Sequence, residues 1–269
     1  MTTVTDVAPA TTAKHRSEVA TSLPPARGQS FLKLVTIELR KSVNTRSGRF
    51  LIAAILLLAI AAITWQLTHL PDQGPVGFDF FFGAASTGVM LLLPVIGVMA
   101  MTSEWTQRTA LTTFTLSPRR IRVQLAKFVS AVVLTAAVLT GVVGLTFVGT
   151  ALAGAVSDLD TTYAGLGGQL AGGYLSAALN VVMAAAFGAV IAQTAAGILV
   201  YFIAPTAWSL AGPALFKDNA NWLDVFGALG RIAERDLHGM VPETLVAVGV
   251  WIVLPTIVGL WASSRREVK

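Results

Sequence analysis

The sequence predicts an all-α integral membrane protein with six transmembrane helices, for three reasons. The 269 residues are 54% hydrophobic and only 12% charged, with a mean hydropathy of +0.71. Six windows hold the roughly twenty mostly apolar residues that cross a bilayer. The Lys and Arg residues gather in alternate connecting segments. A soluble globule needs more polar surface than this composition supplies, so we expect the chain to lie in a membrane.

The part of the chain before the first span is expected to form two different segments. Residues 1–30 are rich in Ala, Thr, Ser and Pro and hold no apolar run of signal-peptide length, which predicts a disordered cytoplasmic tail. Residues 31–49 are expected to form an amphipathic helix in the membrane interface, because Lys33, Thr36 and Arg40 recur at helical spacing among apolar residues. A plain stop signal beside a span would explain the charge but not this periodicity.

The six spans are expected at residues 50–68, 80–102, 126–153, 165–192, 195–214 and 243–262, with a cytoplasmic tail at 263–269. Only a short uncharged turn separates the fourth span from the fifth, which predicts a hydrophobic hairpin. The span interiors are read as free of ionisable side chains, their strongest polar groups being amides such as Gln66, Gln169 and Asn180. Ion-coupled carriers usually place ionisable groups at the membrane midplane, so this weakens a secondary-transport function.

The distribution of charge predicts the orientation in the membrane. Of the 19 Lys and Arg residues, eight precede the first span, five lie at 104–127 and three follow the last span. The opposite loops hold nine Asp and Glu residues against only Lys217, Arg231 and Arg235. By the positive-inside rule, both termini and the segment 104–127 are expected to be cytoplasmic. Because the basic residues flank apolar spans, they fit insertion topology and anionic lipid, and nucleic-acid binding is not supported.

The segment from Glu104 to Lys127 is expected to fold as two short helices. Ser103 is a candidate N-cap, which would put Glu104 in a first helical turn, where a carboxylate meets the positive end of the helix dipole. Ser117 and Pro118 are typical of the start of a second helix that continues into the membrane.

Three arginines, Arg119, Arg120 and Arg122, crowd the start of that second helix. Positive charge is disfavoured at a helix N-terminus, so an acidic neighbour should compensate them. Lipid phosphate and an acidic groove on a cytosolic subunit are both open as that neighbour, and composition alone favours lipid.

Several motifs resemble those of type-2 ATP-binding-cassette exporter permeases, six-span proteins common in bacteria. The likeness covers about residues 31–265, and the order and spacing of its motifs make it specific. Before the first span the motifs are Ile37-Glu38-Leu39-Arg40-Lys41 and Thr45-Arg46-Ser47-Gly48, typical of actinobacterial members. After the second span they are Glu104-Trp105-x-x-Arg108-Thr109-x-Leu111, Leu116-x-Pro118-x-Arg120 and Ala126-Lys127. One departure is Arg108, where many relatives have Gly.

The resemblance implies a dimer of permeases in the bacterial plasma membrane, bound to two cytosolic ATPase subunits that hold ATP and Mg²⁺. A coupling helix between the second and third spans would sit in a cleft on each ATPase and transmit its closure. The coupling residues implied are Glu104, Trp105, Arg108, Thr109, Leu111, Pro118, Arg119, Arg120 and Lys127. Those of the interfacial helix are Glu38, Arg40, Lys41 and Arg46.

The segment 213–241, between the fifth and sixth spans, resembles the short external re-entrant helices of the same family. Trp222, Phe226 and Leu229 would form its apolar stripe.

The residue inventory argues against an enzyme. The chain has no cysteine, its three histidines are scattered, and no phosphate-binding loop motif occurs, so we expect no metal or cofactor in this chain and a nucleotide site on another polypeptide. The leading hypothesis is an exporter permease for an amphipathic or hydrophobic substrate such as a drug, lipid or peptide. Two alternatives stay open: an ion-coupled secondary carrier, and a non-transporting membrane scaffold or immunity protein.

Overall fold

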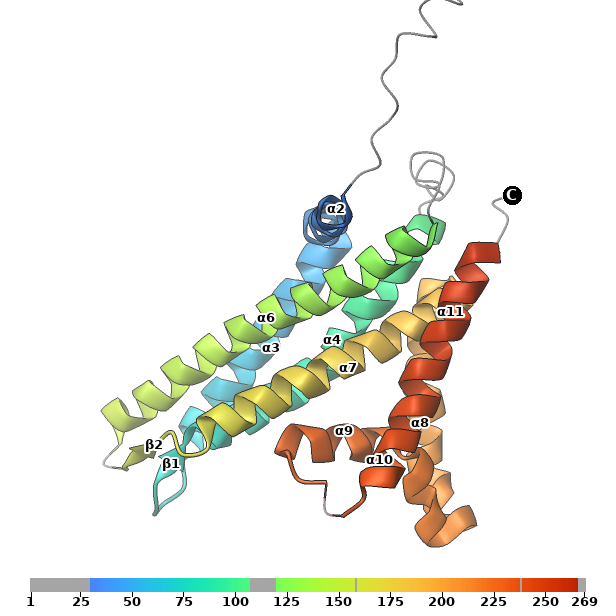
Figure 1. The fold of residues 1–269 in the computed structure, drawn as a ribbon. Coiled ribbons are helices and arrows are strands. Elements are labelled where there is room, and N and C mark those ends of the chain that lie inside the picture. Colours follow the sequence, from blue (N-terminus) through green and yellow to red (C-terminus); the bar gives the residue numbers. More distant parts are fainter. Residues whose placement is uncertain (1–29, 107–119, 158, 238, 266–269) are drawn as a thin grey trace, which may run out of the picture. The chain divides into compact units, whose positions relative to one another are not determined.

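The computed structural model describes residues 30–106, 120–157, 159–237 and 239–265. The part of the chain that begins at Phe31 forms one compact unit, and its described residues are almost all helical (Figure 1). Six of its helical segments are long and apolar enough to cross a membrane. The predicted fold class, an all-α six-span membrane protein, is therefore confirmed. The two tails expected at 1–30 and 263–269 lie largely outside the described residues.

The spans agree with the predicted windows to within a few residues at most ends. They are α3 (Arg46–Thr68), α4 (Phe78–Thr106), α6 (Arg120–Val156), α7 (Leu166–Ile191), α8 (Thr194–Phe216) and a last span made of α10 (Val241–Val248), the π-helical turn η2 (Gly249–Val253) and α11 (Leu254–Arg265). The shorter elements are α2 (Phe31–Asn44), β1 (Val76–Gly77), β2 (Thr161–Thr162), the 3-10 helix η1 (Lys217–Leu223) and α9 (Val225–Glu234).

The predicted boundary between the interfacial helix and the first span is wrong by several residues. The chain breaks at Thr45, whose backbone is extended and whose hydroxyl accepts a 3.1 Å hydrogen bond from the Gly48 amide as the N-cap of α3. A side chain at position 48 would collide with the carbonyl oxygen of Ser42, so only glycine fits this elbow. The helix predicted at 31–49 therefore ends at Asn44, and the first span starts at Arg46 instead of 50.

Three spans form the inside of the bundle and three form its outside. The most apolar windows of α4, α6 and α7 are 50%, 44% and 56% buried, whereas those of α3, α8 and the last span are each 17% buried. Helix α4 is central, because it packs against α3, α6, α7 and α8. The outer spans expose large apolar side chains such as Leu57, Leu199 and Ile257, as expected of surfaces that face lipid or a second membrane chain.

Small residues let the inner helices approach closely. Gly97 of α4 lies against the backbone of α7 at Val181 and Ala185, and a Cβ on Gly188 of α7 would meet the carbonyl oxygen of Val98 at 3.0 Å. Gly172 of α7 lies against the backbone of α9 at Ala233. Without a hydrophobic driving force between helices in lipid, such close packing is a main source of association.

The hairpin predicted between the fourth and fifth spans is confirmed. Helix α7 ends at Ile191, Ala192 takes a left-handed conformation with φ 58°, and Gln193 caps α8 by accepting a 3.2 Å hydrogen bond from the Ala196 amide. The hydroxyls of Thr194 and Thr102 are 2.7 Å apart, so the start of α8 is tied to α4.

The segment between the fifth and sixth spans folds as η1 and α9, and both pack against α10. Figure 1 shows α9 beside α10 at the end away from α2. Leu229 is 4% exposed and packs with Phe226 against α7 and α8, as predicted for the apolar stripe. Trp222 does not share that stripe: it lies in η1 and is 38% exposed. Asp224 separates the two elements because its side chain caps α9 at the Gly227 amide.

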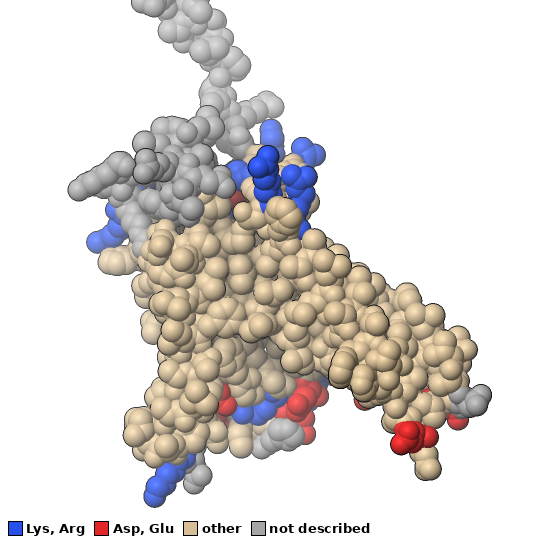
Figure 2. Space-filling view, turned by 180° about the vertical axis from the view of Figure 1, so that it is seen from behind, with Lys and Arg blue, Asp and Glu red and all other residues tan. Residues whose placement is uncertain are grey.

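Charge gathers at the two ends of the bundle. Figure 2 shows Lys and Arg side chains at the end that carries α2, Asp and Glu among the charged side chains at the other end, and a wide uncharged belt between them. We call the first the basic end and the second the opposite end. An uncharged belt between two charged rims is the surface that a bilayer requires.

We predict that Gly97→Ala destabilises the bundle by about 1–3 kcal/mol, because the new methyl group would collide with the α7 backbone at Val181 and Ala185. The measurement is thermal unfolding of the purified protein in detergent. Gly144→Ala in α6 is the matched control, since a Cβ there meets nothing within 4 Å. An equal melting temperature for both variants would show that α4 and α7 are not in close contact.

Candidate functional site

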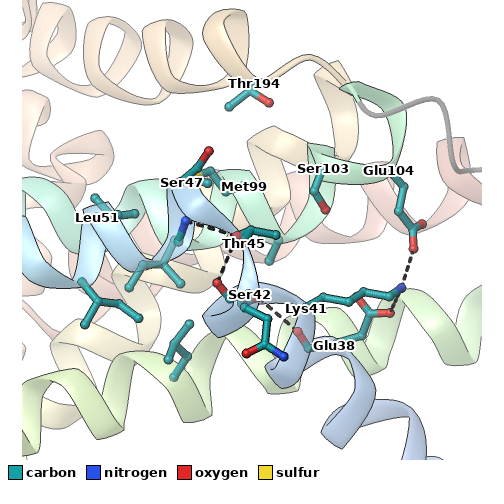
Figure 3. Close-up of a pocket in the computed structure, with 16 residues that line it drawn as sticks. Glu38, Lys41, Ser42, Thr45, Ser47, Leu51, Met99, Ser103, Glu104 and Thr194 are labelled. Atoms are coloured by element: carbon teal, nitrogen blue, oxygen red, sulfur yellow. Dashed lines mark hydrogen bonds and ion pairs between the residues drawn. The ribbon is translucent and has the colours of Figure 1, made fainter.

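Four charged side chains from three helices meet at the basic end, and we call them the charge cluster: Glu38 and Lys41 of α2, Glu104 of α4 and Lys127 of α6. The Lys127 ammonium lies 2.9 Å from Glu38 Oε2 and 3.2 Å from Glu104 Oε1. The Lys41 ammonium lies 2.7 Å from Glu38 Oε1 and 3.0 Å from Glu104 Oε1. Each ammonium therefore contacts both carboxylates, and the four charges sum to zero (Figure 3 shows Lys41 between Glu38 and Glu104).

Helical geometry explains how these residues converge. Glu38 and Lys41 are one turn apart, and Glu38 shares a face with Leu34 and Val35, which are buried against Ala126 of α6. Glu104 lies in the last turn of α4, where the negative end of the helix dipole disfavours a carboxylate. Two ammonium groups offset that cost. The cluster thus joins α2, the end of α4 and the start of α6.

The cluster is mostly removed from solvent. The side chain of Lys127 is 1% exposed, and those of Glu104 and Glu38 are 6% and 8% exposed, whereas that of Lys41 is 43% exposed. Desolvating three charges costs several kcal/mol each unless each is paired with good geometry. Removing any one of the three buried charges would leave an uncompensated charge in a low-dielectric site.

Lys41 is the solvent-facing member of the cluster. Partial burial alone would lower the pKa of Lys41, but its hydrogen bond to Glu38 and the attraction of Glu38 and Glu104 outweigh this and hold the pKa above its ordinary value of 10.5. Lys41 is therefore an ammonium at every physiological pH.

The structure overturns the expectation that a new helix begins at Ser103. Helix α4 continues unbroken through Ser103 and Glu104 to Thr106, so Glu104 ends a span instead of starting a short helix. No breaker occurs near Ser103, and the backbone ladder of α4 continues through it. The lysines of the cluster, not a helix dipole, stabilise the carboxylate.

The expectation that the span interiors hold no ionisable group is wrong at Lys127, which is the second residue of the predicted window 126–153. Helix α6 begins at Arg120, so Lys127 lies two turns inside it and is buried. Its two carboxylate partners come from other helices, one of them distant in sequence, and this pairing is what makes its burial possible.

The predicted coupling residues divide into described and undescribed ones. Glu104 and Lys127 belong to the cluster, Trp105 lies in the last turn of α4, and Arg120 starts α6. Arg108, Thr109, Leu111, Pro118 and Arg119 lie outside the described residues, as do the two short helices expected there. Among the interfacial residues, Glu38 and Lys41 join the cluster, whereas Arg40 and Arg46 are exposed. The sequence feature that could have indicated the cluster is Glu38, because an acidic residue on the apolar face of a helix requires a partner of opposite charge.

A cavity of about 640 Å³ adjoins the charge cluster. It lies among the junction of α2 and α3, helices α4 and α6, and the start of α8, and Figure 3 shows side chains that line it. Among the described residues, no group of three or more His, Cys, Asp or Glu side chains has the arrangement of a metal site.

Comparison of the chain with models of known protein families, with curated proteins and with solved structures found no match.

We predict that Lys127→Met lowers the free energy of unfolding by about 3–5 kcal/mol, since it leaves Glu38 and Glu104 with one ammonium between them. Equilibrium unfolding in mixed detergent, followed by circular dichroism, measures this. Arg40→Met, on the exposed side of α2, is the control and should cost less than about 1 kcal/mol. The double variant Glu38→Gln/Lys127→Met should lose less than the sum of the single variants, and strict additivity would contradict the pairing.

Lys41 should stabilise the fold only while it is charged. Its folded pKa is above the unfolded value, so its contribution is complete below about pH 10.5 and disappears as the pH rises through the folded pKa. We therefore expect the melting-temperature gap between the natural protein and Lys41→Gln to be constant near neutral pH and to narrow above about pH 10.5. If the difference in melting temperature persists in strong alkali, the stabilisation comes from packing of the aliphatic part of Lys41 and not from its charge.

Proposed function

We propose that this chain is the membrane-spanning permease subunit of an ATP-driven exporter, and that a separate cytosolic polypeptide binds and hydrolyses ATP. In this proposal the basic end faces the cytoplasm, and residues 107–119 contact the ATPase through Arg108, Thr109 and Leu111. The substrate class that fits the uncharged spans is hydrophobic or amphipathic. The resemblance of the motifs to type-2 ATP-binding-cassette permeases motivates the proposal.

The charge cluster is the observation that supports it best. Residues 107–119 connect α4 to α6 in the sequence, and the cluster holds both of these helices through Glu104 and Lys127. Glu38 and Lys41 extend the same contacts to α2. A force applied to the connecting segment would therefore act on three helices together. A segment that transmits movement to the spans must be joined firmly to them at both ends. A flexible linker has no such requirement.

The outer spans offer surfaces on which a second copy of this chain could pack. The exposed apolar faces of α3, α8 and α11 offer surfaces that lipid or a second permease would cover. A homodimer with two ATPase subunits is the assembly we propose.

The buried ionisable groups give one specific reason to keep an ion-coupled carrier as the second candidate, because carriers keep such groups for proton or ion relays. In this cluster, however, two carboxylates are matched by two ammonium groups. The cluster thus has no unmatched charge to exchange a proton during transport, and a structural role fits it better. A scaffold or immunity protein would keep the same topology without a partner ATPase.

The test is isolation of the tagged full-length protein from membranes of cells in which it is native. We expect vanadate-sensitive ATPase activity to co-purify with it, and Arg108→Ala to reduce that activity at least about tenfold, which corresponds to 1.4 kcal/mol of lost docking. The thermal stability of the variant should be unchanged. Arg265→Ala, another arginine of the basic end, is the matched control and should keep the activity.

Two results would contradict the proposal. Uptake or efflux driven by a proton gradient and insensitive to ATP would favour the carrier. Purification without any ATPase, and without a change of behaviour in Arg108→Ala, would favour the scaffold.

A further inference from the structure

The cavity beside the charge cluster has walls of two kinds. Leu51, Ile52, Ile96, Met99, Ala100 and Leu134 form an apolar part, while the other lining side chains are mainly hydroxyls, an amide and the cluster residues. Its volume of about 640 Å³ is within the range of small-ligand sites. It lies at the basic end of the spans, where the uncharged belt of the protein meets its charged rim. A ligand that matches both walls has an apolar part and a polar part.

Some of the polar lining groups are already used within the protein. The hydroxyls of Ser42 and Thr45 donate to backbone carbonyl oxygens at 3.1 and 3.2 Å, and that of Thr194 pairs with Thr102. These groups shape the wall and have little capacity left for a ligand.

Other polar lining groups are donors with capacity to spare. Among the described residues, no hydrogen bond joins the side chains of Asn44, Ser47 or Ser103 to another group, and all three line the cavity. Lys41 also lines it and has three N–H donors, two of which contact Glu38 and Glu104. The third is left for a ligand, and the Lys41 side chain is 43% exposed.

The backbone at the start of α3 also favours an anionic ligand. Thr45, Ser47 and Gly48 line the cavity at the N-terminus of α3, a helix of 23 residues, and the positive end of its dipole favours an anion. Glu38 and Glu104 also line the cavity, but Lys41 and Lys127 neutralise both carboxylates, so the charge cluster sums to zero. Arg46 and Arg49, in the first turn of α3, are exposed and do not line the cavity.

We propose that this cavity is a binding site for an amphiphile with an anionic head group and a hydrocarbon chain, drawn from the surrounding leaflet. The head accepts hydrogen bonds from Lys41, Asn44, Ser47 and Ser103, and the chain lies against Ile52, Ile96 and Leu134. Phosphate and carboxylate heads share this chemistry, so an anionic phospholipid and a free fatty acid are its two possible sources. Because the head contacts Lys41, binding reinforces the junction between α2 and α4. The site does not depend on the transport function proposed above.

The test uses the full-length protein in dodecyl maltoside, titrated with lysophosphatidylglycerol, lysophosphatidylcholine or oleate, with bound copies counted by native mass spectrometry. We expect one copy of an anionic probe per chain. Ser47→Ala/Ser103→Ala should weaken that binding about tenfold, since two hydrogen bonds to a charged acceptor are lost. The matched control is Ser86→Ala/Ser264→Ala, which removes two hydroxyls that bond to carbonyls of their own helices.

The three probes separate the two sources. Tight binding of lysophosphatidylglycerol alone supports a phospholipid, and tight binding of oleate alone supports a fatty acid. Tight binding of both supports a site that recognises the anionic charge and not the chemical type of the head group. Equal binding of all three probes would overturn the proposal. So would equal affinities for the two double variants.

A second variant tests the apolar part separately. Ala100→Phe fills the space beside Ile96 without removing any donor, and it should abolish binding of the anionic probe. The melting temperature of each variant without probe shows whether it is folded. A folded Ala100→Phe variant that binds with natural affinity would contradict the placement of the chain.

Discussion

The buried ammonium of Lys127 is the constraint on which the basic end of this protein depends. A charge that is 1% exposed is tolerated only beside opposite charge, and its partners, Glu38 and Glu104, come from two other helices. Those helices must therefore meet α6 in one register. The contacts of α2 and α4 with α6 at the basic end follow from this requirement.

Away from the basic end, close backbone contact takes over as the organising interaction. Glycines at 97, 172 and 188 let α7 touch α4 and α9, and the inner helices α4, α6 and α7 form a common core. The outer spans are much less buried, so lipid or another chain must cover the apolar surface that they expose.

The charge cluster and the cavity meet at one residue. Lys41 contacts both carboxylates of the cluster and also lines the cavity, so the occupancy of the cavity and the geometry of the cluster are linked physically. In the proposed site, a bound anionic head accepts the third N–H of Lys41, while the other two remain with Glu38 and Glu104. The proposed coupling segment and the proposed lipid site therefore act on the same three helices.

The sequence by itself determined the fold class, the approximate spans, the short hairpin turn and the segregation of charge, because each of these depends on composition and local spacing. The π-helical turn before Pro255, the exposed position of Trp222 and the continuation of α4 through Ser103 and Glu104 were visible only in the tertiary structure. Glu38 and Glu104 each had a plausible local function, as an interfacial residue and as a helix-start residue. Only the tertiary structure showed that both carboxylates contact Lys127 as well as Lys41, because Glu38 and Lys127 are 89 positions apart and no local pattern encodes their contact.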